Sequence, residues 1–252
     1  MDPTGEKYVM GTTHGTCKPA MVCAPMKGNG LAKRLSPADP RRAGFTQTEH
    51  VLLSLARVVE QRDKHTAGHC ERLAITSVAL GMAMKLERSS LLALYLGGFL
   101  HDVGKVGIPD SILFKPGTLD DQEWEIMRAH PVRGEEICRP LVSMRCVLPI
   151  IRHHHERWDG SGYPDGLRGD RIPLLARVLQ VADIYDALTN PRPYKHAFST
   201  ARALEVLEAE VARGWRDPDI TGLFVRLHKR VLSADLASMQ DSLTHLQDFL
   251  TQ

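Results

Sequence analysis

The chain has 252 residues, of which 43% are hydrophobic and 25% charged, and its formal net charge is +2. This composition is typical of a globular protein and predicts one well-buried domain with tails. A charge so close to neutral gives no reason to expect binding to a nucleic acid polymer or to an anionic membrane. No apolar run approaches the roughly 20 residues that a helix needs to cross a bilayer, and the N-terminus does not resemble a signal peptide. The five cysteines lack zinc-ribbon spacing, which favours reduced thiols and a cytoplasmic location.

The predicted elements are helices, and they begin after a long leader. Residues 1–44 are rich in Pro, Gly, Lys and Arg without an apolar period, which predicts a flexible N-terminal leader. The main domain is expected over residues 45–232 and begins with a capping box at 46–49. A final amphipathic helix is expected over 233–252. Between these limits, the apolar spacing predicts helices over 65–84, 89–101, 120–130, from 131, over 174–188, over 199–214 and from 217. No segment alternates for long, so the expected fold is all-α with no substantial sheet.

The helix over 89–101 is apolar nearly all round, which indicates that it is buried. It therefore carries His101 and Asp102 at its C-terminal end into the interior. Aspartate is almost never fully buried unless it is paired or bound to a metal. His69 precedes a second apolar helix, and Asp183 follows a third apolar stretch. We expect these four residues, each on a buried element, to converge on one divalent cation.

A run of three histidines and an acid at 153–156 is the other unusual feature of the sequence. It is followed by the segment 159–164, which contains two glycines and a proline and is expected to form a loop. A polar helix end followed by a turn would also explain this run. Together, however, His130, His154 and His155 supply enough nitrogen for a second metal ion. Mixed imidazole and carboxylate ligation favours Mn, Fe, Zn or Ni over Ca or Mg.

Three separated motifs carry a resemblance to a known family. They are His-Asp-Val-Gly-Lys at 101–105, His-His-Glu at 154–156 and Asp-Gly-Ser-Gly-Tyr-Pro at 159–164. In this order they resemble the HD-GYP family of bacterial cyclic-di-GMP phosphodiesterases, over roughly residues 46–230. The resemblance implies an HD-domain helical bundle with a Gly-Tyr-Pro loop. It also implies a metal-dependent phosphodiesterase that opens cyclic-di-GMP to pGpG, and it leaves open whether GMP follows.

The resemblance further implies roles for individual residues. One ion would be held by His69, His101, Asp102 and Asp183, and a second by His130, His154 and His155, with Asp102 bridging the two. The expected cofactor is therefore two divalent transition-metal ions, Fe or Mn before Ni, Co or Zn. Asp102 and Lys105 are the expected catalytic residues. The residues expected to contact substrate are Lys105, Gly162, Tyr163, Asp186, Arg192 and Lys195. Asp186 and Glu156 have an alternative role, which is to orient the ligand histidines.

The sequence departs from the family pattern at His65. Some members have a glutamate at this position and hold three ions. Because His65 and His69 are four residues apart, they share one face of a helix. We expect two ions, with His65 beside the site or close to the substrate, and a third ion remains open.

Two rival functions stay open at this stage. One is hydrolysis of another cyclic dinucleotide. The other is a nucleotide-sensing or interaction module that docks diguanylate cyclases (GGDEF proteins) through the Gly-Tyr-Pro loop, although a degenerate sensor would be expected to lack some of the ligands found here. A homodimer is also open. We interpret three tryptophans as packing residues rather than base-stacking platforms: Trp124, Trp158 and Trp215.

Overall fold

The computed structural model describes residues 47–62, 68–191 and 197–231. Within these ranges every regular element is helical and no strand occurs, which confirms the predicted all-α fold. The predicted leader at 1–44 and the predicted helix at 233–252 lie outside the described residues. The α-helices are α1 (Gln47–Arg62), α2 (His69–Ala83), α3 (Arg88–Leu100), α4 (Asp110–Leu113), α5 (Asp121–Arg128), α6 (His130–Cys138), α7 (Leu148–His153), α8 (Leu174–Thr189), α9 (Thr200–Ala212) and α10 (Pro218–Val231). Short 3-10 helices occur at η2 (Val103–Gly107), η3 (Val142–Met144) and η4 (Gly169–Arg171).

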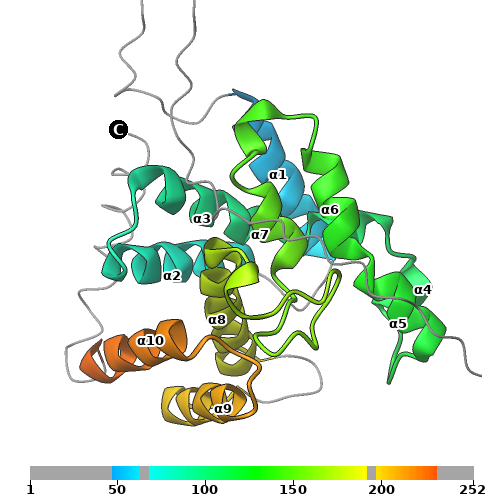
Figure 1. Cartoon of the computed structure of the whole chain (residues 1–252). Helices are drawn as coiled ribbons and strands as arrows, with labels where there is room; N and C mark the ends of the chain where they lie inside the picture. Colours follow the sequence, from blue (N-terminus) through cyan, green and yellow to red (C-terminus); the bar gives the residue numbers. More distant parts are fainter. Residues whose placement is uncertain (1–46, 63–67, 192–196, 232–252) are drawn as a thin grey trace, which may run out of the picture. The chain divides into compact units, whose positions relative to one another are not determined.

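The centre of the fold is the pair formed by α2 and α3, which lie side by side in Figure 1. Their close approach depends on Gly98, because a Cβ at this position would lie 2.5 Å from the Cα of Ala74. Leu73 on α2 and Leu94 on α3 are fully buried in the core. Truncating such a leucine to alanine typically costs about 2–5 kcal/mol of stability. The apolar character predicted for the helix over 89–101 therefore reflects burial at the centre of the domain.

Helix α8 packs against α2, α3 and α7. It carries Asp183, whose Oδ1 lies 3.5 Å from Nε2 of His69 on α2. Val178, Leu179 and Ala182 are completely buried, so α8 is apolar around most of its surface. Helices α9 and α10 lie next to α8 (Figure 1). The ring of Tyr185 on α8 contacts that of Phe224 on α10, with centroids 5.1 Å apart.

The start of α5 is stabilised by a capping box. The carboxylate of Asp120 accepts a hydrogen bond from the backbone N–H of Glu123 at 2.9 Å, and the Glu123 carboxylate accepts one from the N–H of Asp120 at 2.8 Å. This capping box satisfies two backbone donors that the first turn of the helix leaves free. The helix ends at Arg128, two residues earlier than predicted, and α6 begins at His130 rather than at 131.

The glycines and proline in residues 104–109 predict a loop after Asp102, but the structure differs. The segment forms the 3-10 helix η2, in which the N–H of Lys105 donates to the carbonyl of Asp102 at 2.9 Å. Gly104 lies against α6, where a Cβ would be 2.0 Å from the carbonyl oxygen of His130. No side chain fits there, so the glycine allows η2 to pack directly beside His130.

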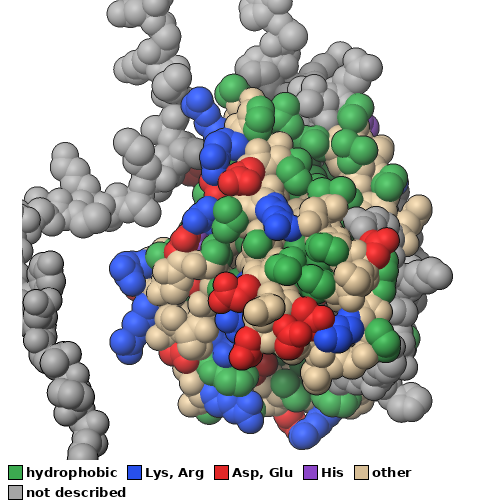
Figure 2. Space-filling model, turned by 90° about the vertical axis from the view of Figure 1, so that its right-hand side faces the viewer, with side chains coloured by type: hydrophobic (Ala, Val, Ile, Leu, Met, Phe, Trp, Pro, Cys, Tyr) green, Lys and Arg blue, Asp and Glu red, His purple; other side chains and the backbone are tan. Residues whose placement is uncertain are grey.

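On the face drawn in Figure 2, basic and acidic side chains are interspersed among apolar ones. None of the described helices is long and apolar enough to span a bilayer.

Candidate metal centre and substrate pocket

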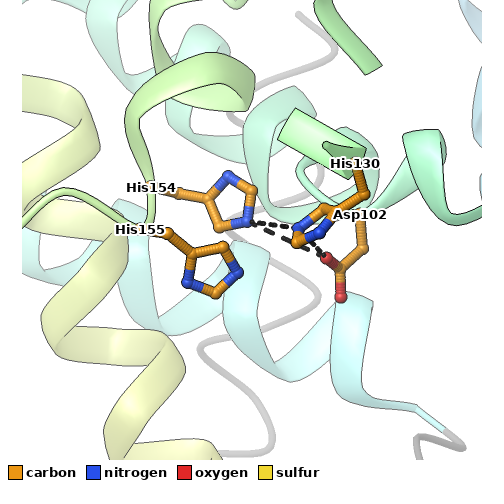
Figure 3. A group of neighbouring side chains, drawn as sticks. All are labelled: Asp102, His130, His154 and His155. Atoms are coloured by element: carbon orange, nitrogen blue, oxygen red, sulfur yellow. Dashed lines mark hydrogen bonds and ion pairs between the residues drawn. The ribbon is translucent and has the colours of Figure 1, made fainter. Parts of the chain in front are cut away.

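Seven predicted metal ligands form two adjoining groups in the structure. Within each group, one ligand atom from each residue lies within 4.8 Å of all the others. The first group consists of His69, His101 and Asp183, and the second of Asp102, His130, His154 and His155. Figure 3 shows the second group, whose side chains point toward one another from different segments. The two groups match the division into two ions implied by the resemblance, apart from the place of Asp102.

Asp102 lies between the two groups. Its Oδ2 atom is 3.2 Å from Nε2 of His101, which belongs to the first group. Its Oδ1 atom is 3.2 Å from Nε2 of His130 and 3.8 Å from Nε2 of His154, which belong to the second. Oδ1 is buried and has no hydrogen-bond partner among the residues that the structure describes. A carboxylate with one oxygen toward each group has the geometry that a bridging ligand needs.

Three of the histidines are oriented by carbonyl groups at helix ends. In each, Nδ1 faces the backbone carbonyl three residues earlier, in the last turn of a helix, where carbonyls lack a partner further along the chain. This contact assigns the proton to Nδ1 and leaves the lone pair of Nε2 directed at the centre. The pairs are His101 with Gly98 at 3.0 Å, His130 with Met127 at 2.8 Å and His154 with Ile151 at 2.7 Å.

His69 is oriented by a carboxylate instead. Its Nδ1 lies 2.7 Å from Oδ2 of Asp186, and its Nε2 lies 3.5 Å from Oδ1 of Asp183. Arg72 donates to both oxygens of Asp186, from Nε at 2.6 Å and from a terminal nitrogen at 3.0 Å. Asp186 therefore has the geometry of the histidine-orienting role, and its expected contact with substrate stays a prediction. Arg72 was not singled out from the sequence, although its position three residues after His69 on α2 is a usable signal.

The charge states suit metal binding at neutral pH. Burial, together with the neighbouring imidazoles, holds the pKa values of His154 and His155 well below the usual range, so both rings are neutral and can offer lone pairs. Burial opposes ionisation of Asp102, but Lys105 and His101 outweigh it and hold the pKa of this carboxyl well below its usual value. Lys105 donates from Nζ to Oδ2 of Asp102 at 2.6 Å.

The residues present fit a divalent transition metal. Five imidazoles and two carboxylates make up the two groups. The buried Oδ1 of Asp102, which has no hydrogen-bond partner among the described residues, costs stability unless a bound ligand compensates it. Nitrogen and oxygen donors in this mixture suit first-row transition metals.

The Gly-Tyr-Pro loop is attached to the histidine run through Glu156. This side chain is fully buried, and its two oxygens accept hydrogen bonds from the backbone N–H groups of Asp165 at 2.8 Å and Leu167 at 3.0 Å. Gly162 is required for the same packing, because a Cβ there would lie 2.2 Å from the backbone nitrogen of Arg157. Glu156 therefore holds the loop, and no contact between its carboxylate and His154 or His155 occurs among the described residues.

The loop closes one side of a cavity of about 390 Å³ beside the donor groups. Tyr163 stacks on the ring of His155, with centroids 4.8 Å apart and an interplanar angle of 25°. Three arginines and a tryptophan also face the cavity. The residues that line it include Trp124, Arg128, His154, His155, Arg157, Gly162, Tyr163, Asp183 and Arg216.

Trp124 is less buried than its interpretation as a packing residue suggests. This side chain is 43% exposed and lines the cavity wall. The sequence could not show this, because α5 is short and its orientation depends on contacts with other segments. Trp158 and Trp215 are half-buried, and each contacts an arginine, Arg177 and Arg157 respectively.

Three residues singled out in the sequence lie outside the described residues: His65, Arg192 and Lys195. Their predicted roles stay predictions. His153, next to two ligand histidines, has Nδ1 at 3.7 Å from Glu156 and 3.5 Å from Asp165, so it belongs to a different group from His154 and His155.

The fold and the donor groups define a helical protein with clustered His and Asp side chains that could hold metal ions, and comparison with known proteins agrees. The HD domain family model matches residues 54–220, so the chain belongs to the HD domain family. The predicted resemblance to HD-GYP phosphodiesterases is confirmed by this match and by relatives named as cyclic di-GMP phosphodiesterases. One is the cyclic di-GMP phosphodiesterase response regulator RpfG of Xanthomonas campestris, 41% identical over 164 residues, or 64% of this chain and 43% of the relative.

A second relative is the 3'3'-cGAMP-specific phosphodiesterase 3 of Vibrio cholerae. It is 33% identical over 187 residues, or 73% of this chain and 41% of the relative. Among solved structures, a cyclic GMP-AMP specific phosphodiesterase of the same organism shares the fold with a TM-score of 0.57 and 22% identity, over 77% of this chain and 52% of that one. The chain thus spans less than half the length of the two curated relatives.

Proposed function

We propose that the chain is a metal-dependent phosphodiesterase that hydrolyses cyclic-di-GMP to pGpG. The observation that carries this proposal is the position of Asp102, whose two oxygens face two separate donor groups at 3.2 Å each, beside a cavity of about 390 Å³. A carboxylate so placed is suited to joining two metal ions. The names of several relatives support the same substrate class.

The proposed cofactor is a pair of divalent ions, Fe or Mn first. One would be held by His69, His101 and Asp183 and the other by His130, His154 and His155, with Asp102 shared. Two such ions supply Lewis acidity, lower the pKa of a bound water and neutralise charge on a phosphodiester. The chain's own residues orient these ligands and exclude bulk water, because four of the ligand histidines are almost completely buried: His69, His101, His130 and His154.

The cationic groups near the centre are suited to the phosphodiester. Lys105 is held by Asp102 at the edge of the donor groups, where its ammonium can contact a phosphate oxygen. The resemblance adds Arg192 and Lys195 as a phosphate-binding pair. Gly162 and Tyr163 line the cavity, which suits their expected contact with the nucleotide.

A second candidate substrate is 3'3'-cGAMP. The specific observation in its favour is that relatives 33% and 39% identical to this chain carry that substrate in their names. The same ligands and the same reaction would serve both substrates. Comparing kcat/KM for the two cyclic dinucleotides distinguishes the candidates.

The proposed setting is the cytoplasm, where the free thiols of Cys70 and Cys138 would stay reduced. Docking of diguanylate cyclases through the Gly-Tyr-Pro loop, and formation of a homodimer, are expectations from the resemblance. A pull-down with a purified GGDEF protein and size-exclusion chromatography with light scattering test them separately.

The activity is tested by chromatography of reaction products. Protein reconstituted anaerobically with Fe or Mn should convert cyclic-di-GMP to pGpG. The Asp102→Asn variant should lose this activity while its circular dichroism stays unchanged. The matched control is Asp170→Asn, because the Asp170 side chain is 90% exposed and pairs with Arg177, which belongs to neither donor group. Reconstituted wild type that leaves every cyclic dinucleotide intact would contradict the proposal.

A further inference from the structure

We propose that α5 supplies a guanine-recognition subsite, in which Arg128 binds the edge of a guanine base and Trp124 stacks on its face. The inference rests on the proposed function and names the part of the substrate that the cavity selects. It assigns specificity to two residues outside the three family-like motifs, in a helix that the sequence alone left without a functional role.

The two residues lie four apart on α5 and therefore share one face of the helix. The guanidinium of Arg128 lies 5.6 Å from the centroid of the Trp124 ring and 5.6 Å from the centroid of the Tyr163 ring. All three side chains line the same cavity. Tyr163 in turn stacks on His155, so this wall continues directly into the second donor group. A nucleotide with its phosphate at the donor groups would place a base against this wall.

Arg128 differs from the other two arginines of the cavity in its partners. Arg216 donates to Glu210 at 2.7 Å and to Gln180 at 3.3 Å, and it is only 9% exposed. Arg157 lies over the ring of Trp215, 4.1 Å from its centroid. Among the described residues, no carboxylate and no hydrogen-bond acceptor pairs with Arg128, which contacts only the two aromatic rings. Its N–H donors are therefore available to a ligand.

The chemistry of Arg128 favours guanine over adenine. A guanidinium offers only donors, in a planar fork. Guanine presents two acceptors, O6 and N7, on one edge, whereas adenine presents one acceptor and one donor there. An arginine facing this edge therefore makes two hydrogen bonds to guanine. To adenine it makes only one, and its second N–H donor faces the amino group of adenine, which is also a donor. Trp124 is 43% exposed at the cavity wall, so its ring face can stack on either purine.

The test compares steady-state kinetics on cyclic-di-GMP, 3'3'-cGAMP and cyclic-di-AMP. Arg128→Ala should raise KM for cyclic-di-GMP about 10- to 150-fold, as expected for the loss of hydrogen bonds from a charged donor, and it should leave kcat nearly unchanged. Its KM for cyclic-di-AMP should stay close to that of wild type, so the preference for guanine falls. The KM for 3'3'-cGAMP should rise with that for cyclic-di-GMP, because its single guanine can occupy the subsite.

Conservative variants test which property of each side chain matters. For Arg128 they separate the planar guanidinium from its positive charge, and for Trp124 they separate the aromatic ring from the size of the side chain. Arg128→Lys keeps the charge but loses the planar fork, so it should lose most of the guanine preference. Trp124→Ala should raise KM for all three substrates by about 5- to 150-fold, and Trp124→Phe should restore most of the affinity. The control is Arg139→Ala, which removes a 57% exposed arginine outside the cavity lining. Unchanged base preference in both Arg128 variants would overturn the inference while leaving the phosphodiesterase activity established.

The outcome also separates this inference from the proposed function. If metal-loaded wild type hydrolyses none of the three nucleotides, the proposed function fails, and the same proteins are titrated with cyclic-di-GMP and cyclic-di-AMP instead. A guanine preference in Kd that Arg128→Ala abolishes would still support the subsite. Equal affinity for both nucleotides, or no binding of either, would overturn it.

Discussion

At the scale of single residues, the centre depends on which nitrogen of each imidazole carries the proton. Three ligand histidines direct Nδ1 at a helix-end carbonyl and one directs it at Asp186, which leaves Nε2 facing the neighbouring donors. These contacts come from the fold and not from the ligands themselves. A residue that never touches the metal can therefore change metal affinity.

Asp186→Ala should weaken metal binding about 10- to 100-fold, as expected when the partner of a ligand histidine is removed. Both Nδ1 of His69 and the guanidinium of Arg72 would lose their acceptor. The measurement is a competition titration of Mn or Zn against a chelator. Asp186→Asn, which keeps one oxygen, should fall between wild type and the alanine variant. Equal affinity in all three proteins would show that the contact does not orient His69.

At the scale of elements, the loop after the histidine run is held by two separate sets of hydrogen bonds. Glu156 binds its backbone from inside the protein, and Arg152 on α7 binds Asp165 from outside, with two contacts of 2.7 Å. The first involves a fully buried carboxylate and the second a partly exposed ion pair. The two sets of hydrogen bonds should therefore contribute different amounts to the free energy of unfolding, and their contributions should depend differently on pH.

Glu156→Gln should lower the free energy of unfolding by about 1–3 kcal/mol, because the amide replaces one acceptor oxygen by a donor that faces a backbone N–H. Urea denaturation measures the change. Glu208→Gln is a suitable control, since the Glu208 side chain is 53% exposed and pairs with Lys229 at 3.4 Å. A loss for Glu156→Gln no larger than for the control would argue against the proposed attachment of the loop.

The ion pair of Arg152 with Asp165 should stabilise the fold only above acid pH. Hydrogen bonds from Arg152 lower the pKa of Asp165 below the usual value of 3.8. Its contribution is therefore complete above about pH 4 and is lost as the pH falls through the depressed folded-state pKa. Metal-free Asp165→Asn should be less stable than wild type at pH 7, by about 0.2–1 kcal/mol, and the difference should shrink as the pH falls through that depressed pKa. A difference that persists undiminished through this fall in pH would exclude this charge effect.

At the scale of the whole molecule, the parts that the sequence predicts are those with a local signal. His101 and Asp102 follow an apolar helix, and the histidine run precedes a loop that needs its glycines, so both ligand groups could be anticipated. The wall formed by Trp124 and Arg128 could not, because its position depends on how α5 faces Tyr163 across the cavity. The 3-10 helix η2 was also missed, since its form depends on the contact of Gly104 with His130.

The measurement that tests the central claim most directly is the metal-to-protein ratio of wild type and single-ligand variants after anaerobic reconstitution with Fe or Mn. The account predicts about two ions per chain in wild type. His69→Ala and His130→Ala should each lower the ratio to about one, because they remove ligands from different groups. A wild-type ratio below one half, or one near three that falls to two in His65→Ala, would contradict two ions shared through Asp102.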